Sequence, residues 1–177
     1  MATVAAISAI LRDKFPGAAF EPMPLLRRGG VGGDQEYIRI EPTRLVEVLA
    51  FLRNDPRTRF EQLCDLTCVD YLNFPDATDR YGVVYSLLSL THNHRIWLKC
   101  FVNDPTPKVP SATGIYAGAE WMEREVFDMF GVVFENHPDL RRILTWDGFE
   151  ANPLRKDYPL RGKGERENYE VLTRDSA

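Results

Sequence analysis

The fold is decided by the stretch RYGVVYSLLSLTHNHRIWLKCFV, residues 80–102. Two runs within it, 80–90 and 95–102, are rich in β-branched, aliphatic and aromatic residues, which favour strands. The short polar segment between the two runs is typical of a hairpin turn. Along the second run the residue type alternates, so a strand there turns one face toward a core. The residues predicted to face this core are Ile96, Leu98, Cys100 and Val102.

Periodicity predicts helices and further strands on both sides of this hairpin. The predicted helices cover residues 4–15, 42–53 and, as one or two turns, 138–144. A further helical region is predicted over 111–130, with Gly114 or Gly118 as the place where an interruption is expected. The predicted strands cover residues 36–41, 66–71 and 132–134. Three prolines predict a loop over 103–110. We therefore expect an α+β fold: a single domain, residues 1–144, with a mixed or antiparallel sheet packed by helices, and an extended C-terminal arm, residues 145–177.

Composition excludes several classes of protein. The 177 residues include 22 Lys and Arg against 26 Asp and Glu, and this net charge of −4 argues against a nucleic-acid binder. The longest apolar stretch is too short to span a membrane, so membrane association is expected only through a partner. The N-terminus lacks the features of a secretory signal, which predicts a cytoplasmic chain. Three cysteines, expected to be buried reduced thiols, lack the spacing of a cluster site: Cys64, Cys68 and Cys100.

The glycine-rich stretch GGVGG, residues 29–33, invites comparison with a phosphate-binding loop. No Gly-Lys-Ser/Thr ends this stretch, and a strand pattern follows it instead of a helix. We therefore interpret it as a flexible hairpin loop.

Charged side chains are densest in EREVFDMFGVVFENHPDLRRIL, residues 123–144. Carboxylates near a histidine suit a metal site or acid–base chemistry, but Glu123 and Glu125 are two residues apart and point to different helix faces. Arg124 has ion-pair spacing to Glu120 and to Asp128. A solvated or interface salt-bridge network is favoured, while a metal or acid–base site and a single buried charge pair stay open. The candidates are Glu123, Arg124, Glu125, Asp128, His137, Arg141 and Arg142.

The run PLRKDYPL, residues 153–160, mixes prolines, fixed charges and apolar side chains without any period. Ordering a residue costs about 1–2 kcal/mol, so such an arm needs a surface to lie on. Its cations can pair with acidic groups of a partner, and its apolar side chains can supply anchors. The candidate partner-binding residues are Arg155, Lys156, Asp157 and Tyr158.

These two segments resemble the C-type subunit of the respiratory NADH-quinone oxidoreductase, complex I, also called its 30 kDa subunit. The resemblance includes the Glu-Arg-Glu triplet at 123–125, the run FDMFG at 127–131, Asn-His-Pro at 136–138 and Arg-Ile-Leu at 142–144. It continues upstream through DLT and VDY, residues 65–71, and covers residues 40–162. Before the Pro-Leu-Arg-Lys-Asp run, where that family commonly has Gly and then His or Tyr, this chain has Ala151 and Asn152.

The resemblance implies a non-catalytic scaffold subunit in the hydrophilic arm of a proton-translocating enzyme. That enzyme passes electrons from NADH through FMN and iron–sulfur clusters in partner subunits to a quinone, and this chain is expected to hold no cofactor or metal. The implied partners are the large quinone-site subunit, of D type, and cluster-bearing subunits of B and I types. The implied location is peripheral, on the cytoplasmic side of the cell inner membrane.

Two alternatives stay open. One is the homologous subunit of a related membrane-bound hydrogenase or photosynthetic-type dehydrogenase, because the shared motifs mark the scaffold and not the electron donor. The other, of a different class, is a stand-alone metal-dependent hydrolase that uses Glu123, Glu125, His137 and His94.

Overall fold

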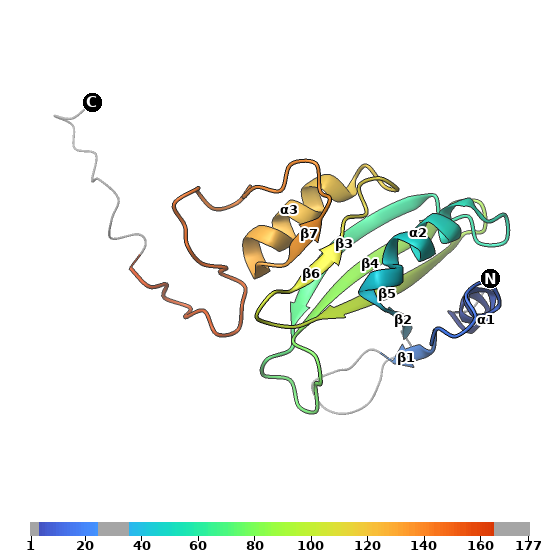
Figure 1. Cartoon of the computed structure of the whole chain (residues 1–177), viewed down its shortest axis with the longest axis horizontal. Helices are drawn as coiled ribbons and strands as arrows, with labels where there is room; N and C mark the ends of the chain where they lie inside the picture. The colour runs from blue at the N-terminus through green and yellow to red at the C-terminus, as the bar shows by residue number, and fades with distance from the viewer. Residues whose placement is uncertain (1–3, 25–35, 165–177) are drawn as a thin grey trace.

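The hairpin predicted at residues 80–102 is formed by β4 (Tyr81–Ser89) and β5 (His94–Val102), which pair antiparallel along their full lengths. On its other side β4 pairs antiparallel with β3 (Gln62–Asp70), a longer strand than the sequence predicts. The computed structural model describes residues 4–24 and 36–164 (Figure 1). The glycine-rich stretch and the last part of the predicted arm lie outside the described residues.

Two further strands extend the sheet beyond β5. β2 (Glu36–Ile40) runs parallel to β5, and the short strand β1 (Pro22–Pro24) pairs antiparallel with β2. Among the described residues the order is β1-β2-β5-β4-β3, so the sheet is mixed. The short strands β6 (Lys108–Pro110) and β7 (Val133–Glu135) form a separate parallel pair. The predicted α+β fold with a mixed sheet is confirmed.

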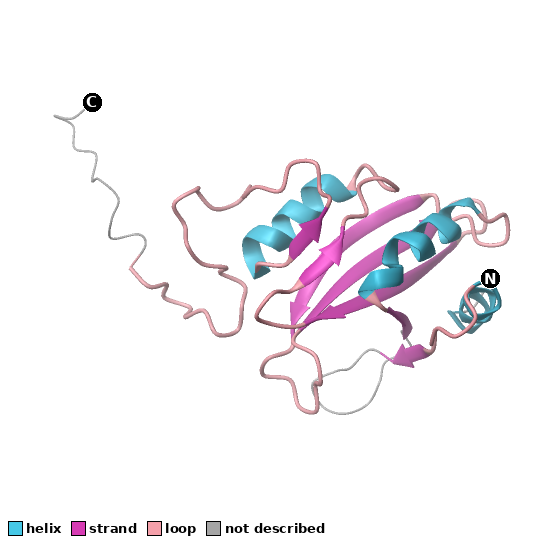
Figure 2. Ribbon diagram, viewed as in Figure 1, coloured by secondary structure: helices cyan, strands magenta, loops and turns pink. Residues whose placement is uncertain are grey.

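In the described part of the chain, three α-helices pack with the sheet (Figure 2). α1 (Val4–Lys14) and α2 (Leu45–Asn54) match the predicted helices, although the chain enters α2 through a short 3-10 turn, Pro42–Arg44. α3 (Ala119–Phe130) contacts β3 and is followed directly by β7. In the part of the chain that the structure describes, no helix is long and apolar enough to cross a membrane.

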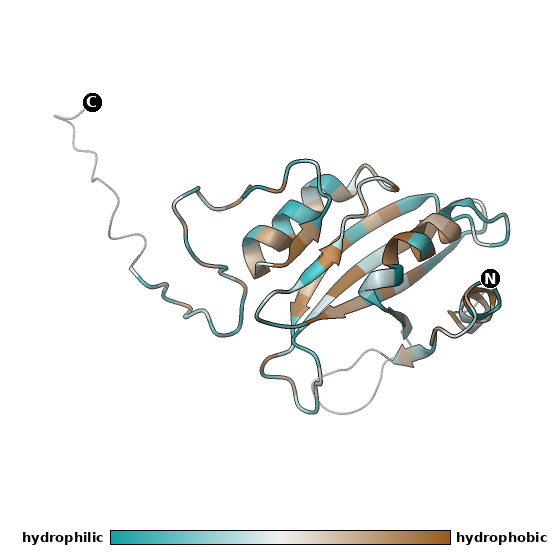
Figure 3. Cartoon of the chain, viewed as in Figure 1, coloured by the Kyte–Doolittle hydropathy of each residue, from teal (hydrophilic) through white to brown (hydrophobic). Residues whose placement is uncertain are grey.

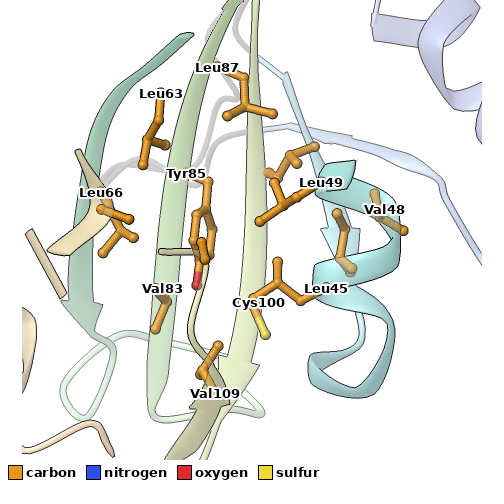
Figure 4. Close-up of a cluster of buried hydrophobic side chains, with 14 of the residues drawn as sticks. Leu45, Val48, Leu49, Leu63, Leu66, Val83, Tyr85, Leu87, Cys100 and Val109 are labelled. Atoms are coloured by element: carbon orange, nitrogen blue, oxygen red, sulfur yellow. The ribbon is translucent and has the colours of Figure 1, made fainter. Parts of the chain in front are cut away.

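The core lies between the inner face of the sheet and the elements packed on it. Bands of apolar and polar residues follow one another along the long strands (Figure 3), although β4 is buried over most of its length and does not alternate strictly. Figure 4 shows the inward side chains of β3, β4 and β5 meeting those of α2 and β6. Each fully buried aliphatic or aromatic side chain contributes roughly 1.5–3 kcal/mol to folding. The face predicted for the last long strand is confirmed, since these residues are buried: Ile96, Leu98, Cys100 and Val102.

One helix prediction is wrong in part and another is wrong throughout. In the helical region predicted from Ser111, the α-helix begins only at Ala119, directly after Gly118, one of the two glycines where an interruption was expected. Ser111 instead continues the pairing of β6 with β7, because its amide donates to the Glu135 carbonyl (2.9 Å). The helical turns predicted over residues 138–144 are absent from the described structure, because the amides at the end of that segment bind a side chain of α3, as described below.

The loop predicted over residues 103–110 is also wrong at its end, where β6 forms. The strand β1 has no counterpart among the predicted strands. Both are short edge strands that contain proline, and an edge is the position in a sheet where a missing amide donor is tolerated. Proline in a single sequence usually indicates a loop, so the sequence pattern does not predict these strands.

Two buried tyrosines give a matched test of this core. The Tyr116 hydroxyl donates to the Phe60 carbonyl (2.8 Å), whereas the Tyr85 hydroxyl has no hydrogen-bond partner among the described residues. We expect Tyr116→Phe to lower the free energy of unfolding by about 1–3 kcal/mol, because it leaves a buried carbonyl unpaired. Tyr85→Phe should change it by less than about 1 kcal/mol or raise it. Urea unfolding measures both, and equal losses would contradict the assignment.

Candidate functional site

Helix α3 turns most of its charged side chains inward. Glu123, Arg124 and Asp128 are buried, whereas Glu125 is exposed on the opposite face, as the two-residue spacing predicts. Buried charges are costly unless other groups pair with them, so each must be satisfied by neighbouring chain. Three of the five charged side chains of α3 therefore lie inside the protein, so a solvated network does not describe them, while the predicted network at an interface stays a prediction.

Asp128 organises the segment that follows β7. Its Oδ2 accepts hydrogen bonds from the amides of Ile143 (3.1 Å), Leu144 (2.7 Å) and Thr145 (2.9 Å). Its Oδ1 accepts from the Thr145 hydroxyl and from the Arg142 guanidinium (2.7 Å). Burial raises the pKa of this carboxyl, but the hydrogen bonds outweigh burial and lower the pKa to about 2. A turn of successive amides around one carboxylate thus replaces the predicted helix.

The same segment supplies donors to the last carbonyls of α3. The Asn152 side chain donates to the carbonyls of Phe127 (3.3 Å) and Asp128 (3.0 Å). The amide of Leu154 donates to the Met129 carbonyl (3.1 Å). A helix leaves its final carbonyls without partners inside the helix, so these bonds satisfy groups that would otherwise need water.

Arg155 completes this C-terminal cap. Its Nε donates to the Phe130 carbonyl (2.7 Å), which places a cation at the negative end of the helix dipole. The chain turns away from α3 at Gly131, which has a φ of +78°. A Cβ at this glycine would lie 2.6 Å from the Asn152 side-chain oxygen, so the cap and the turn exclude larger residues. We call residues 142–158, which surround the end of α3, the arm root.

A second contact ties the arm root to the ends of β3 and β4. The buried carboxylate of Asp70, the last residue of β3, accepts the Lys156 amide (2.8 Å). Arg80, just before β4, pairs with Asp157 (2.7 Å), with Asp104 and with Asp70 (3.5 Å). The arm root therefore bridges the sheet and α3.

Arg124 does not form the ion pairs that its spacing predicts. Its guanidinium donates to the carbonyls of Arg141 (3.1 Å) and Arg142 (3.4 Å) and lies over the Trp121 ring (4.8 Å). Arg141 itself is exposed and pairs with Asp139 (2.8 Å). Helix spacing alone predicted partners on the helix, but the following loop lies closer to this side chain.

Glu123 and His137 lie together at the other end of α3. The Glu123 carboxyl accepts from the Ala112 amide (2.7 Å) and the Ser111 hydroxyl (2.7 Å), and the His137 Nε2 lies 3.9 Å from it. His137 Nδ1 accepts the Asp139 amide (3.0 Å), so its Nε2 carries the proton and donates to the Glu120 carbonyl (3.0 Å). Both side chains thus hold loops on the helix.

The metal site left open by the sequence lacks a converging set of ligands. His94 packs edge-on against Phe60 (4.8 Å between ring centroids) at the start of β5, and Glu125 faces outward. Only Glu123 and His137 of the four candidates meet. Within residues 4–24 and 36–164, no group of three or more His, Cys, Asp or Glu side chains is arranged to hold a metal ion. The charged residues that the structure does bring together lie in the arm root around the end of α3, which is the candidate site.

The arm root and the residues just after it present apolar side chains outward. Leu144, Trp146 and Leu154 of the arm root are each at least 40% exposed, and Leu160, just beyond the arm root, is fully exposed. Leu144, Trp146 and Leu160 line an open hollow of about 610 Å³ that also has Phe149 and Tyr158 in its wall. Exposed apolar side chains gathered along one segment are typical of a surface that binds another protein.

Several residues that build the arm root were missed by the sequence prediction. Their side chains bind backbone groups or residues far along the chain, so no local sequence pattern identifies them. Asn152, for instance, was noted only as a departure from a family pattern. The missed residues are Asp70, Arg80, Asp104, Thr145 and Asn152.

The buried carboxyl of Glu123 predicts a specific pH dependence. Burial, opposed by the hydrogen bonds from Ser111 and Ala112, raises its pKa from 4.5 to about 7. The folded protein then holds this proton more tightly than the unfolded chain, so the free energy of unfolding falls as the pH rises between these two values. We expect Glu123→Gln to remove a fall on the order of 2 kcal/mol between about pH 5 and about pH 8, measured by urea unfolding. An unchanged pH dependence would contradict this assignment.

Comparison with known proteins places the chain in a family. The sequence pattern of the family described as "Respiratory-chain NADH dehydrogenase, 30 Kd subunit" matches residues 38–164. The mitochondrial NADH dehydrogenase (ubiquinone) iron-sulfur protein 3 of Candida albicans is 50% identical over 129 residues, which are 73% of this chain and 45% of that protein. The C-type subunit of NADH-quinone oxidoreductase from Caulobacter vibrioides is 54% identical over 118 residues, 67% of this chain and 58% of that protein. The matched part thus spans about half the length of these relatives.

Two solved structures share the fold. A trypsin-resistant fragment of Nqo5 aligns with a TM-score of 0.55 and 34% identity over 60% of this chain and 83% of that chain. A chain from the membrane-bound sulfane sulfur reductase, an archaeal respiratory membrane complex, aligns with a TM-score of 0.69 over 96% of this chain and 93% of that chain. At 22% identity the second likeness shows the fold alone. The family match covers β2 to β7, α3 and the arm root, and the chain belongs to the family of the 30 kDa subunit of respiratory-chain NADH dehydrogenase.

Proposed function

We propose that this chain is a non-catalytic scaffold subunit of a proton-translocating NADH:quinone oxidoreductase. In this proposal residues 1–144 form the domain, and residues 145–177 form an arm that binds neighbouring subunits. The family match supports the assembly, and the arm root supports the role within it. The observation that carries the proposal is that the arm root is fixed to α3 and β3 from within, while its apolar side chains face outward.

The contacts that hold the arm root in place would make it easier for a scaffold subunit to bind its partner. An arm that binds a partner loses less conformational entropy on binding when its first part is already held in place. Arg155 binds Asp104 and the Phe130 carbonyl of the same chain, and Asp157 pairs with Arg80. In this proposal Arg155 and Asp157 therefore position the arm. The outward side chains Leu154 and Leu160 then make the contact with the partner.

The charged residues of α3 have positioning roles in the same proposal. Asp128 shapes the arm root through its bonds to amides 143–145, and Arg142 joins it there. Glu123 and His137 hold the loops at the other end of the helix. Arg124 fastens the segment at Arg141, while Glu125, Lys156 and Tyr158 are proposed to contact partner subunits.

Cofactors, partners and location follow from the family in this proposal. Electrons would pass from NADH through FMN and iron–sulfur clusters in partner subunits to a quinone, with no cofactor in this chain. The proposed partners are the large D-type subunit at the quinone site and the cluster-bearing B- and I-type subunits. The proposed location is peripheral, on the cytoplasmic side of the cell inner membrane. A related hydrogenase or photosynthetic-type assembly would place different donor subunits beside the same scaffold.

Affinity purification of the tagged full chain from its own cells tests the proposal. We expect flavin and iron–sulfur subunits to co-purify with the chain and to carry NADH:quinone reductase activity. A chain that purifies alone with stoichiometric metal and hydrolase activity would contradict the scaffold. Co-purifying hydrogenase subunits would replace the assembly with the related one.

Variants of the arm test its role within the assembly. We expect Leu154→Glu with Leu160→Glu to reduce co-purification about tenfold or more, because two buried interface anchors each contribute on the order of 1–2 kcal/mol. The matched control is Val46→Glu with Leu90→Glu, which places the same charges at exposed apolar residues of α2 and the β4–β5 turn. Equal incorporation of the two double variants would contradict a partner-binding arm.

A further inference from the structure

The outer face of the sheet carries a second surface that the proposed arm does not use. The helices pack on the inner face, and the outward side chains of β3, β4 and β5 surround an open hollow of about 470 Å³. Val69 on β3 is 38% exposed, and Val84 and Trp97 beside it are half-buried. The residues that surround the hollow are Cys64, Asp65, Thr67, Val69, Val84, Ser86, Arg95, Trp97 and Lys99.

A buried lysine, Lys99, lines both this hollow and a smaller neighbouring hollow that has Tyr37 and Tyr71 in its wall. Lys99 on β5 is only 4% exposed, and its Nζ donates to the Tyr71 hydroxyl (2.9 Å). The same ammonium group lies over the Tyr37 ring, 4.3 Å from the centroid. Burial lowers the pKa of Lys99 to about 8, because the charged ammonium group is poorly solvated there.

No carboxylate of the described chain pairs with Lys99. Two carboxylates line the smaller hollow: Asp79 is paired with Arg39 (2.9 Å), and Asp76 forms no ion pair with Lys99. Among the described residues, Arg95 at the rim of the larger hollow also takes part in no ion pair. A lysine is rarely this buried unless a counter-charge accompanies it, and a phenol and a ring face offset only part of the desolvation cost.

We propose that this outer face binds a segment of another subunit that presents an Asp or Glu carboxylate to Lys99 beside an apolar side chain packed on Val69 and Trp97. The two cations Lys99 and Arg95 face a single carboxylate, Asp65, around the hollow, so charge complementarity selects an acidic partner. The flanking apolar side chains select a protein segment and not a small anion. This inference rests on the proposed function, because the partner is a subunit of the same assembly.

Charge substitutions at Val69 test the sign of the partner's charge. The tagged full chain is expressed in its own cells, and the fraction of the chain in the large assembly is measured. We expect Val69→Glu to lower this fraction about tenfold, because the new carboxylate competes for Lys99 and repels the partner. Val69→Lys, of similar length and opposite charge, should stay within about twofold of the wild type. Val46→Glu is the control, since Val46 on α2 is 39% exposed away from this face.

Several outcomes would overturn the proposal. One is that both Val69 variants enter the assembly equally well or equally poorly. Another is that Val46→Glu lowers the fraction of chain in the assembly as much as Val69→Glu does. If Val69→Glu fails to fold by circular dichroism, Arg95→Glu replaces it with the same expectation, and its full incorporation overturns the proposal. Carbodiimide coupling of the wild-type assembly should join Lys99 to another subunit, and a link to this chain's own residues 165–177 would overturn the assigned partner. A wild-type chain that purifies alone refutes the proposed function, whereas failure of these variants alone refutes only this inference.

Discussion

The end of helix α3 is the point on which the described structure depends. Its last four carbonyls, at residues 127–130, all receive donors from outside the helix, and three kinds of donor take part: an amide side chain, backbone amides and guanidinium groups. The donors come from Gly131 and from the arm root, which is up to 25 residues away in the sequence. Capping the helix and fixing the arm are therefore one event, because the same bonds do both.

Asp128 makes this arrangement specific. A carboxylate that accepts three successive amides and a guanidinium fixes the direction of the chain at Thr145, and the lowered pKa shows that the charged form is the one preferred. The arm root then reaches Asp70 at the end of β3, so α3, the sheet and the arm share one network of bonds. Such a junction imposes strict sequence requirements, because removal of one partner leaves a buried charge uncompensated.

Sequence patterns predicted the parts of the fold that local spacing determines. The alternation at residues 95–102 identified the buried face of β5, and the spacing of Glu123 and Glu125 separated their faces on α3. The failures share a cause: the turn at residues 143–145 and the partners of Arg124 depend on groups far along the chain. The sequence identified the candidate charged residues in 123–142 but not their partners. Many of these partners are backbone amides and carbonyls, which every residue has, so the residue type does not reveal them. The burial of Lys99 was likewise not predicted, because the alternation of residue types along β5 places this lysine on the outer face of the sheet.

Amide hydrogen exchange of the intact, isolated chain tests the junction most directly. The amides of Leu144, Thr145, Leu154 and Lys156 donate to Asp128, Met129 and Asp70 and should exchange at least about 100-fold more slowly than in an unstructured peptide. In Asp128→Asn the first two should lose most of this protection, while the amides of β4 keep theirs. If the four amides of the wild-type chain exchange at the unprotected rate while β4 stays protected, the arm root is not fixed to α3 and the account is wrong.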